Sequence, residues 1–261
     1  MKSLHNDKGP KWTTVAKIRS LMTRVFAVGF IHEKVTKNPV VAVEISTTSE
    51  YEAILITPPQ TVAILGLLGK NLLHFILVLT CAATALRASE IVALRWSDIR
   101  WDEGRIRISK RWAKGKDDKT KTEASDDYVP MHPVLAVSLN DWRKQSPYSK
   151  STDFVFPSFK CSGKVPLSAS SFVKDHLRPA AKLAGVVIAD GERFGLHNLR
   201  HSLSNWRVNK RKENPKTVQG ILRHGRIQTT LDLYAQSDRD EMQAAQGAFL
   251  TEMGMGTEAV Q

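Results

Sequence analysis

The segment from Leu72 to Leu86 most constrains the fold of this chain. It is apolar except for His74 and two threonines. A helix that crosses a bilayer needs about 20 apolar residues, so this shorter run suits the interior of a protein rather than a membrane. It predicts a buried core helix over residues 72–84, around which the other elements must pack.

A second helix is predicted immediately before this core helix. Thr57 is a suitable N-cap residue, and Pro58 and Pro59 fit the first helical positions, where a backbone N–H is not needed. The helix is expected to run to about Leu68 and to end at Gly69.

Strand signals occupy the middle of the chain. Residues 105–108 alternate arginine with isoleucine, which predicts a strand with one apolar face. Asp127–Pro130 is a second strand candidate, and a long polar loop is expected between the two. The pair predicts a β-hairpin or a small antiparallel sheet.

Helical patterns dominate the rest of the sequence. Ser89 is a plausible cap for a helix through about Trp96. Further helices are predicted at 13–32, 134–144, 169–184, 197–209, 215–223, 228–235 and 238–250. The fold class is therefore α+β and mostly helical, with a small antiparallel β-sheet. Residues 40–56 are weakly patterned and are interpreted as a linker between two bodies.

The charge balance favours a polyanionic partner. Lysine and arginine number 38 against 26 acidic residues, which gives a formal charge of +12. Nucleic acid is the simplest such partner, although a merely basic soluble protein remains the alternative. Two cysteines, Cys81 and Cys161, are too few for a disulfide framework, so a cytoplasmic, nucleoid-associated location is expected. No cluster with metal-ligand spacing and no signal peptide is recognised.

The basic residues concentrate in two stretches, which would suit a duplex held between them. The first stretch contains Arg105, Arg107, Lys110, Arg111, Lys114, Lys116, Lys119 and Lys121. The second contains Arg200, Arg207, Lys210, Arg211, Lys212, Lys216, Arg223 and Arg226. For any single lysine, a solvated surface charge is the simpler interpretation.

Two arginines and a histidine suit chemistry on a phosphate diester. Cleavage without a metal requires fixed cations on the non-bridging oxygens, and the planar guanidinium groups of Arg87 and Arg200 meet that need. His197 and Arg200 are three residues apart, so on a helix they share a face. The alternative is that this His-x-x-Arg spacing occurs by chance.

Tyr234 is the candidate nucleophile. A phenol has a pKa near 10 and needs cationic neighbours to ionise, which His197, Arg200 and His224 could provide. The alternative is a tyrosine packed on an amphipathic helix. Lys121 is the candidate acid that protonates the leaving 5′ oxygen. Lys114, Lys116 and Lys119 compete with it for that role.

Taken together, these motifs resemble the tyrosine recombinases of the phage integrase family. Residues 84–90 and 93–99 resemble the first arginine box of that family, and residues 121–125 before Val129-Pro130 resemble its β-hairpin lysine. Residues 197–202 are similar to the second box, residues 222–225 to the third, and residues 229–234 to the nucleophile segment. The similarity covers roughly residues 55–240.

The resemblance implies a mechanism and a role for each residue. Tyr234 would attack the scissile phosphate of double-stranded DNA to form a 3′-phosphotyrosyl bond, with no metal, cofactor or ATP. Arg87 and Arg200 would hold the phosphate, and His197 would act as an acid/base partner. Lys121 would be the acid, and His224 a hydrogen-bond donor to the phosphate. Integration, excision or resolution of DNA would follow when a second 5′ hydroxyl attacks the covalent bond.

The resemblance also implies an organisation and an assembly. Residues 1–50 would be the remnant of a helical core-binding domain plus a linker, and residues 55–261 the catalytic domain. The family works as a homotetramer on two synapsed duplexes, and a free monomer is expected here. The alternatives are a truncated, non-catalytic DNA-binding remnant and a basic helical regulator.

The sequence departs from the family pattern beside two of these motifs. Arg223 stands where the family commonly has glycine next to the third-box histidine. Asp126 and Asp127 occupy positions after the lysine loop that are often basic.

Overall fold

The computed structural model describes residues 12–44, 53–119, 127–223 and residue 230, and it divides the chain into two units. The first unit is Met1–Glu52 and the second is Ala53–Gln261. In the first unit, helix α1 (Trp12–Ile31) forms where residues 13–32 predict a helix. Its following turn folds back on it, since the amide Nδ2 of Asn38 donates to the carbonyl of Thr23 at 2.9 Å.

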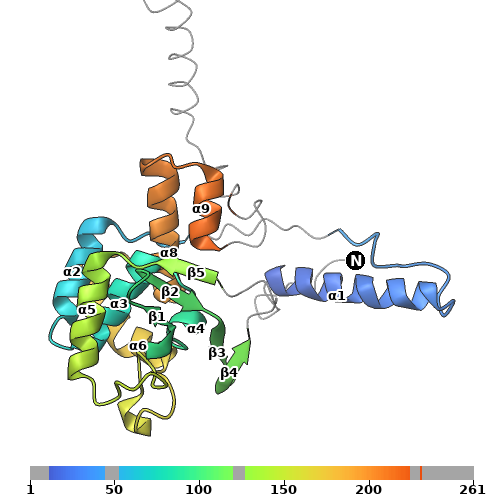
Figure 1. Ribbon diagram of the computed structural model, residues 1–261. Helices are drawn as coiled ribbons and strands as arrows, with labels where there is room; N and C mark the ends of the chain where they lie inside the picture. Colours follow the sequence, from blue (N-terminus) through green and yellow to red (C-terminus); the bar gives the residue numbers. More distant parts are fainter. Residues whose placement is uncertain (1–11, 45–52, 120–126, 224–229, 231–261) are drawn as a thin grey trace, which may run out of the picture. The chain divides into compact units, whose positions relative to one another are not determined.

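The second unit is built around α3 (Leu72–Thr84), the helix that the apolar run predicts. Ile76, Leu77 and Val78 on it are completely buried. Helices α2 (Pro58–Leu68), α5 (Pro133–Gln145) and α8 (Leu196–Asn205) pack against it, and Figure 1 shows them grouped around it. The prediction of a buried core helix is confirmed.

The N-terminus of α2 is fixed by the cap that the sequence predicts. The hydroxyl Oγ1 of Thr57 accepts from the backbone N–H of Gln60 at 3.4 Å, and the Gln60 side chain accepts from the N–H of Thr57 at 2.9 Å. This reciprocal pair satisfies two backbone donors that the helix itself leaves free.

A three-stranded antiparallel sheet lies beside the helices, in the order β1 (Ile99–Arg100), β2 (Arg105–Ile108), β5 (Asp127–Pro130). Ile106 pairs with Val129, and both are buried in the core. The alternating arginines of β2 point the other way and remain partly exposed. The predicted small antiparallel sheet is confirmed.

The connection between the predicted strands contains more structure than the expected loop. Strands β3 (Lys110–Ala113) and β4 (Lys116–Lys119) form a separate antiparallel hairpin. Its turn residues, Lys114 and Gly115, both have positive φ, as two-residue hairpin turns require. The sequence concealed this hairpin because its strands are polar and lack an alternating apolar face.

The helix predicted from Ser89 to Trp96 is much shorter. Helix α4 covers only Ala88–Ile91, and its first turn is capped because a carboxylate oxygen of Glu90 accepts the N–H of Arg87 at 3.0 Å. Trp96 instead begins the 3-10 helix η1 (Trp96–Asp98) and is buried, with its indole N–H donating to the carbonyl of Tyr148 at 2.8 Å.

Between residues 133 and 222 the named elements are all helical, as predicted. The predicted helix 169–184 appears as α6 (Ala169–Phe172), a π-helical turn η3 (Val173–Leu177) and α7 (Arg178–Leu183). Beyond α8, a π-helical turn η4 (Trp206–Lys210) leads to α9 (Pro215–Leu222). A 3-10 turn, η2 (Phe159–Cys161), follows α5. The helix predicted at 238–250 and most of the one at 228–235 fall outside the described residues.

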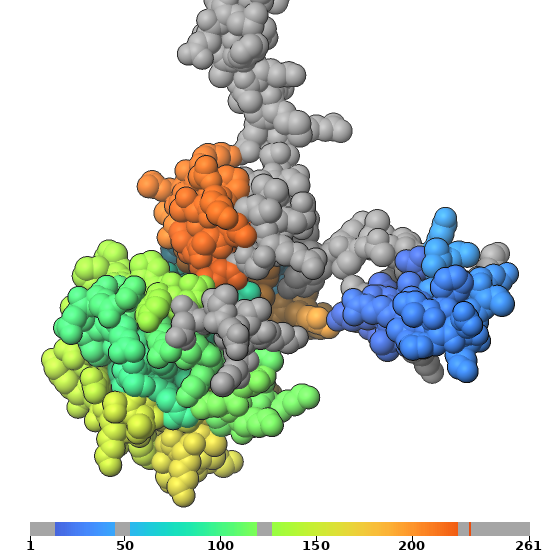
Figure 2. Space-filling model, turned by 45° about the vertical axis from the view of Figure 1, so that its right-hand side comes forward, coloured from blue at the N-terminus to red at the C-terminus, as the bar shows by residue number. Residues whose placement is uncertain are grey.

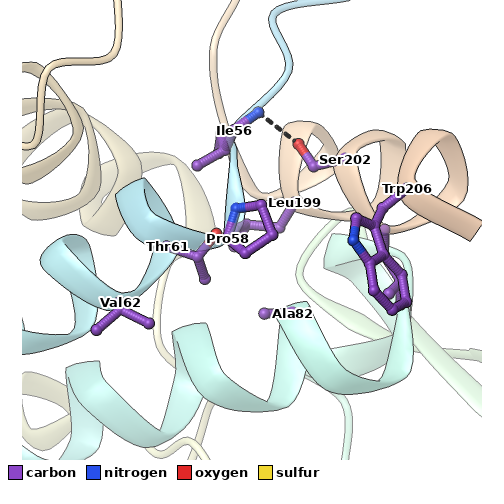
Figure 3. Close-up of a pocket in the computed structure, with 9 residues that line it drawn as sticks. Ile56, Pro58, Thr61, Val62, Ala82, Leu199, Ser202 and Trp206 are labelled. Atoms are coloured by element: carbon purple, nitrogen blue, oxygen red, sulfur yellow. Dashed lines mark hydrogen bonds between the residues drawn. The ribbon is translucent and has the colours of Figure 1, made fainter. Parts of the chain in front are cut away.

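Helix α8 is joined to the segment that enters α2. The hydroxyl of Ser202 accepts from the N–H of Ile56 at 2.7 Å, and the side-chain amide of Asn198 donates to the carbonyl of Ile54 at 3.0 Å. An apolar groove of about 310 Å³ lies where α2, α3 and α8 meet, with Leu199 and Trp206 in its wall (Figure 3). Among the residues that the structure describes, no helix is long and apolar enough to cross a membrane.

Candidate active site

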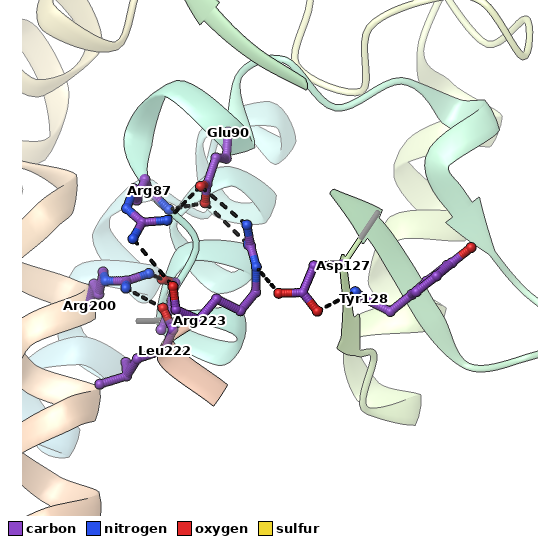
Figure 4. Close-up of polar contacts among 8 residues, drawn as sticks. Arg87, Glu90, Asp127, Tyr128, Arg200, Leu222 and Arg223 are labelled. Carbon is purple, nitrogen blue, oxygen red and sulfur yellow. Dashed lines mark hydrogen bonds and ion pairs between the residues drawn. The ribbon is translucent and has the colours of Figure 1, made fainter. Parts of the chain in front are cut away.

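The end of α9 is the point at which the predicted arginines meet. The last carbonyls of a helix have no partner within the helix and carry partial negative charge. Arg200 on α8 donates from Nη2 to the carbonyl of Leu222, and Arg87 donates from Nη2 to the carbonyl of Arg223 at 3.5 Å (Figure 4). Two arginines separated by more than a hundred residues therefore bind consecutive carbonyls.

Arg200 is almost completely buried, with 4% of its surface exposed. Its Nη1 donates to the carbonyl of Ala85 at 2.5 Å, so its two terminal nitrogens join the end of α3 to the end of α9. Burial, followed by the charge of Arg87, lowers the pKa of Arg200 to about 10. The group thus remains cationic at neutral pH.

Arg87 occupies the accessible side of the same site. Its side chain is 40% exposed, and Nη1 donates to Glu90 at 2.8 Å. Glu90 is itself buried. Burial alone would raise the pKa of Glu90, but the charge of Arg223 and the hydrogen bonds from Arg87 lower it below its ordinary value. A buried carboxylate therefore orients a partly exposed guanidinium.

Two strained turns supply the carbonyls that bind these arginines. Ala85 and Arg223 have φ values of +53° and +52°. The left-handed region costs a residue other than glycine roughly 1–2 kcal/mol. Such strain concentrates at sites where the surrounding contacts hold it in place, and here both carbonyls accept from a candidate catalytic arginine.

His197 lies near the N-terminus of α8, one turn before Arg200. Its ring is edge-on to that of His201, with centroids 4.9 Å apart. Partial burial, followed by the charges of His201, Arg200 and Arg87, lowers the pKa of His197 to about 4. His197 is therefore neutral at pH 7 and can accept a proton. His197 is exposed and Arg200 is buried, and the charges of Arg200 and Arg87 both act on His197.

Figure 2 shows the C-terminal part of the described chain in orange next to green surface. The end of α9 binds Arg87 and Arg200, and both of these arginines act on His197 through their charges. Lys121, His224 and Tyr234 lie outside the described residues. In the sequence, His224 directly follows Arg223, and Lys121 comes six residues before Asp127.

Sequence reasoning did not predict the ion-pair network that three further residues of the site form. Glu90, Asp127 and Arg223 form an ion-pair network with Arg87, and Arg223 contacts both acidic residues. The available signals were the position of Glu90 in the first turn of a helix and the two departures at Asp127 and Arg223. Only the fold shows that the two departures face each other.

Several arginines of the two basic stretches are buried or paired with acidic residues. Arg200 and Arg223 point inside, and Arg207 is paired with Glu213 at 2.8 Å. In the hairpin, Arg111 is paired with Asp118 at 2.5 Å. Lys110, Lys114 and Lys116 are exposed. The positive surface is therefore smaller than the count of basic residues implies.

The fold is that of the tyrosine recombinases. The integrase of transposon Tn1549, in complex with circular intermediate DNA, matches with a TM-score of 0.77 at 19% identity, over 93% of this chain and 81% of that one. A lambda integrase dimer bound to a COC′ core site matches with a TM-score of 0.60 at 16% identity, over 88% and 75%. XerA recombinase gives a TM-score of 0.54 at 17% identity, over 88% and 74%.

The family assignment rests on the sequence itself. Residues 49–241 match the phage integrase family, and this chain belongs to that family. It is a tyrosine-type site-specific recombinase. Comparison with curated protein sequences gives no match.

Proposed function

We propose that this chain cleaves and rejoins double-stranded DNA through a 3′-phosphotyrosyl intermediate on Tyr234. The main supporting observation is that Arg87 and Arg200, far apart in the sequence, converge at the end of α9. The residue after that end in the sequence is Arg223, and His224 follows it. The DNA complexes of the Tn1549 and lambda integrases are consistent with a DNA partner.

In the proposed reaction, the phenolate oxygen of Tyr234 forms a bond to phosphorus while the bond from phosphorus to the 5′ oxygen breaks. The leaving oxygen takes a proton from Lys121 and departs as a 5′ hydroxyl. The phenol of Tyr234 gives its proton to neutral His197 as its oxygen bonds to phosphorus, and His224 donates a hydrogen bond to a non-bridging oxygen. Rejoining reverses these steps with the 5′ hydroxyl of a partner strand.

The two arginines have different tasks in this proposal. Arg200 is buried and held by two carbonyls, so it provides a fixed positive charge with little freedom. Arg87 has the more exposed side chain and can turn a nitrogen towards the phosphate. Preorganised donors of this kind typically lower the barrier by about 2.7–4 kcal/mol each. The fixed cations replace a metal in this proposal. The phosphotyrosyl bond retains the energy of the broken phosphodiester bond, so no ATP is proposed.

The test is covalent trapping on nicked duplexes. A library of nicked duplexes with randomised central base pairs is incubated with the protein, and the DNA that becomes attached is sequenced. We expect a covalent adduct that Tyr234→Phe abolishes and that mass spectrometry locates on Tyr234. Tyr148→Phe is the matched control, because the Tyr148 ring packs against Phe159, away from the arginines, and should leave adduct formation unchanged.

Salt-dependent DNA binding without any adduct would contradict the proposal and would leave the chain as a DNA-binding protein only.

We also propose a homotetramer on two synapsed duplexes and a monomer in free solution. Mass photometry with and without the trapped DNA measures both states. A stable tetramer without DNA would contradict this assembly.

A further inference from the structure

All three nitrogens of the Arg223 guanidinium donate to carboxylates. Its Nε donates to Asp127 at 2.7 Å, and its Nη1 and Nη2 donate to the two oxygens of Glu90, each at 3.3 Å (Figure 4). Only 8% of its side chain is exposed. Every nitrogen of the group therefore has an acidic partner, so the charge of Arg223 is compensated within the protein, whereas the printed partners of Arg200 are carbonyls.

The backbone at this position does not favour a side chain. Arg223 has a φ of +52°, a conformation that glycine adopts without strain and other residues adopt at a cost. Contacts of the side chain must therefore offset the strain, and the contacts are with Glu90 and Asp127.

Glu90 transmits the effect of Arg223 to the candidate catalytic arginine. Its Oε1 accepts from Nη1 of Arg87 and from Nη2 of Arg223, and its Oε2 accepts from the backbone N–H of Arg87 and from Nη1 of Arg223. Each oxygen of one buried carboxylate thus joins the two arginines. If Arg223 is removed, only the bonds from Arg87 remain to hold this carboxylate.

We propose that Arg223 is a positioning residue: acting through Glu90, it fixes the guanidinium of Arg87, and through Asp127 it ties β5 to the same point. Three segments are joined in this way, namely the start of α4, the first residue of β5 and the end of α9. In the sequence, these segments adjoin Arg87, the stretch with Lys121, and His224. The inference rests on the proposed function for its catalytic readout.

The proposal has a consequence for pH dependence. Glu90 faces Arg87 and Arg223 directly, its own charge raises the pKa values of Arg200 and His197, and Asp127 pairs with Arg223. Asp98, Arg107 and Lys110 also line a gap beside Glu90 that is too small to hold water. The charge of Arg223 is the largest influence that lowers the pKa of Glu90, so this pKa rises when Arg223 is removed. Glu90 would then be protonated, and would release Arg87, at a higher pH.

The experiment compares the wild type with Arg223→Gly, Arg223→Lys and Asp127→Asn on the nicked duplex trapped by the wild type. The rate of adduct formation at saturating DNA, the Kd for the duplex and the pH–rate profile are measured. Arg223→Gly should slow adduct formation about tenfold with little change in Kd. That loss is smaller than the roughly 10²–10³-fold expected when a catalytic donor is deleted outright. In the pH–rate profile of Arg223→Gly, the fall in rate on the acid side (the acid limb) should occur at a higher pH than in the wild type.

The other variants separate the contact of Arg223 with Glu90 from its contact with Asp127. Arg223→Lys restores a charge without the fork and should recover part of the rate. Asp127→Asn is isosteric and should cause a smaller loss in the same direction, and Asp127→Asn should add nothing in the Arg223→Gly background. Thermal melting confirms that each variant is folded. If Arg223→Gly does not fold, the lysine and asparagine variants carry the comparison.

A readout without DNA keeps the inference separate from the proposed function. In ¹⁵N NMR, hindered rotation of the Arg87 guanidinium should resolve its Nη signals in the wild type and lose that resolution in Arg223→Gly. Unchanged Arg87 signals, or a wild-type rate and acid limb in Arg223→Gly, would overturn the positioning role. If no adduct forms but the Arg87 signals change as expected, the proposed function fails and the positioning inference stands.

Discussion

Arg87 and Arg200 should differ sharply in their importance for stability, although both are assigned to the same phosphate. Arg200→Ala removes the donors to the carbonyls of Ala85 and Leu222. A buried acceptor left without a partner costs about 1–3 kcal/mol. Losing Arg200 also removes the cost of keeping its charge buried, so we expect destabilisation in the lower part of the summed range, about 2–4 kcal/mol. That is a large fraction of the 5–15 kcal/mol typical of a folded domain.

Arg87→Ala should be much milder. The side chain is 40% exposed, and its partner Glu90 keeps both hydrogen bonds from Arg223. Partly exposed ion pairs contribute about 0–1 kcal/mol, so the expected loss is at most about 1 kcal/mol. Both substitutions should nevertheless reduce adduct formation by roughly 10²–10³-fold.

Urea denaturation followed by circular dichroism measures the two free energies of unfolding, and the nicked-duplex assay measures the two rates. Arg200→Lys is an informative intermediate, because one ammonium cannot replace both terminal nitrogens of a fork. Arg200 is assigned as the buried arginine that stabilises the fold, and Arg87 as the accessible arginine that contacts the phosphate. This assignment would be wrong if Arg87→Ala destabilised the protein as much as Arg200→Ala.

Three further predictions concern other parts of the site. The folded-state pKa of His197, about 4, lies below the ordinary 6.5, so the stability that this group contributes is present above pH 6.5 and is lost as the pH falls towards 4; an NMR titration midpoint near 6.5 would contradict this. Asn198→Ala should destabilise the protein by about 2–4 kcal/mol, since it strands the N–H of residue 195 and the carbonyl of residue 54, and an unchanged urea midpoint would refute it. Lys114→Ala, at the exposed hairpin turn, should reduce the slope of log K against log salt for duplex binding by about 0.9; Arg111→Ala should change it less, because Asp118 already pairs with Arg111, and equal changes would count against a free lysine contact.

The core and most of the elements could be predicted from the sequence because they follow local rules. The apolar run gave α3, the Thr57 cap and the two prolines gave the start of α2, and the alternating isoleucines gave β2. The β3–β4 hairpin was missed because its polar strands carry no apolar periodicity. Helix α4 was predicted too long because the backbone of Leu94 and Trp96 bonds to residues 153 and 155, far along the chain, instead of continuing the helix.

The candidate site divides in the same way. Residue type and order alone selected Arg87, His197 and Arg200 for phosphate chemistry, since few side chains combine a permanent charge with a planar fork. Sequence could not show that Arg200 is buried and Arg87 accessible, because burial depends on which helices pack over a residue.

The sequence by itself determined the helical core, the small sheet and the inventory of chemical groups. Only the tertiary structure decided that Arg223 and Asp127, separated by 96 residues, form an ion pair beside Glu90. The physical reason is that local patterns record the preferences of the backbone and the placement of apolar surface. A charge network across three segments depends on distances that exist only after the chain has folded.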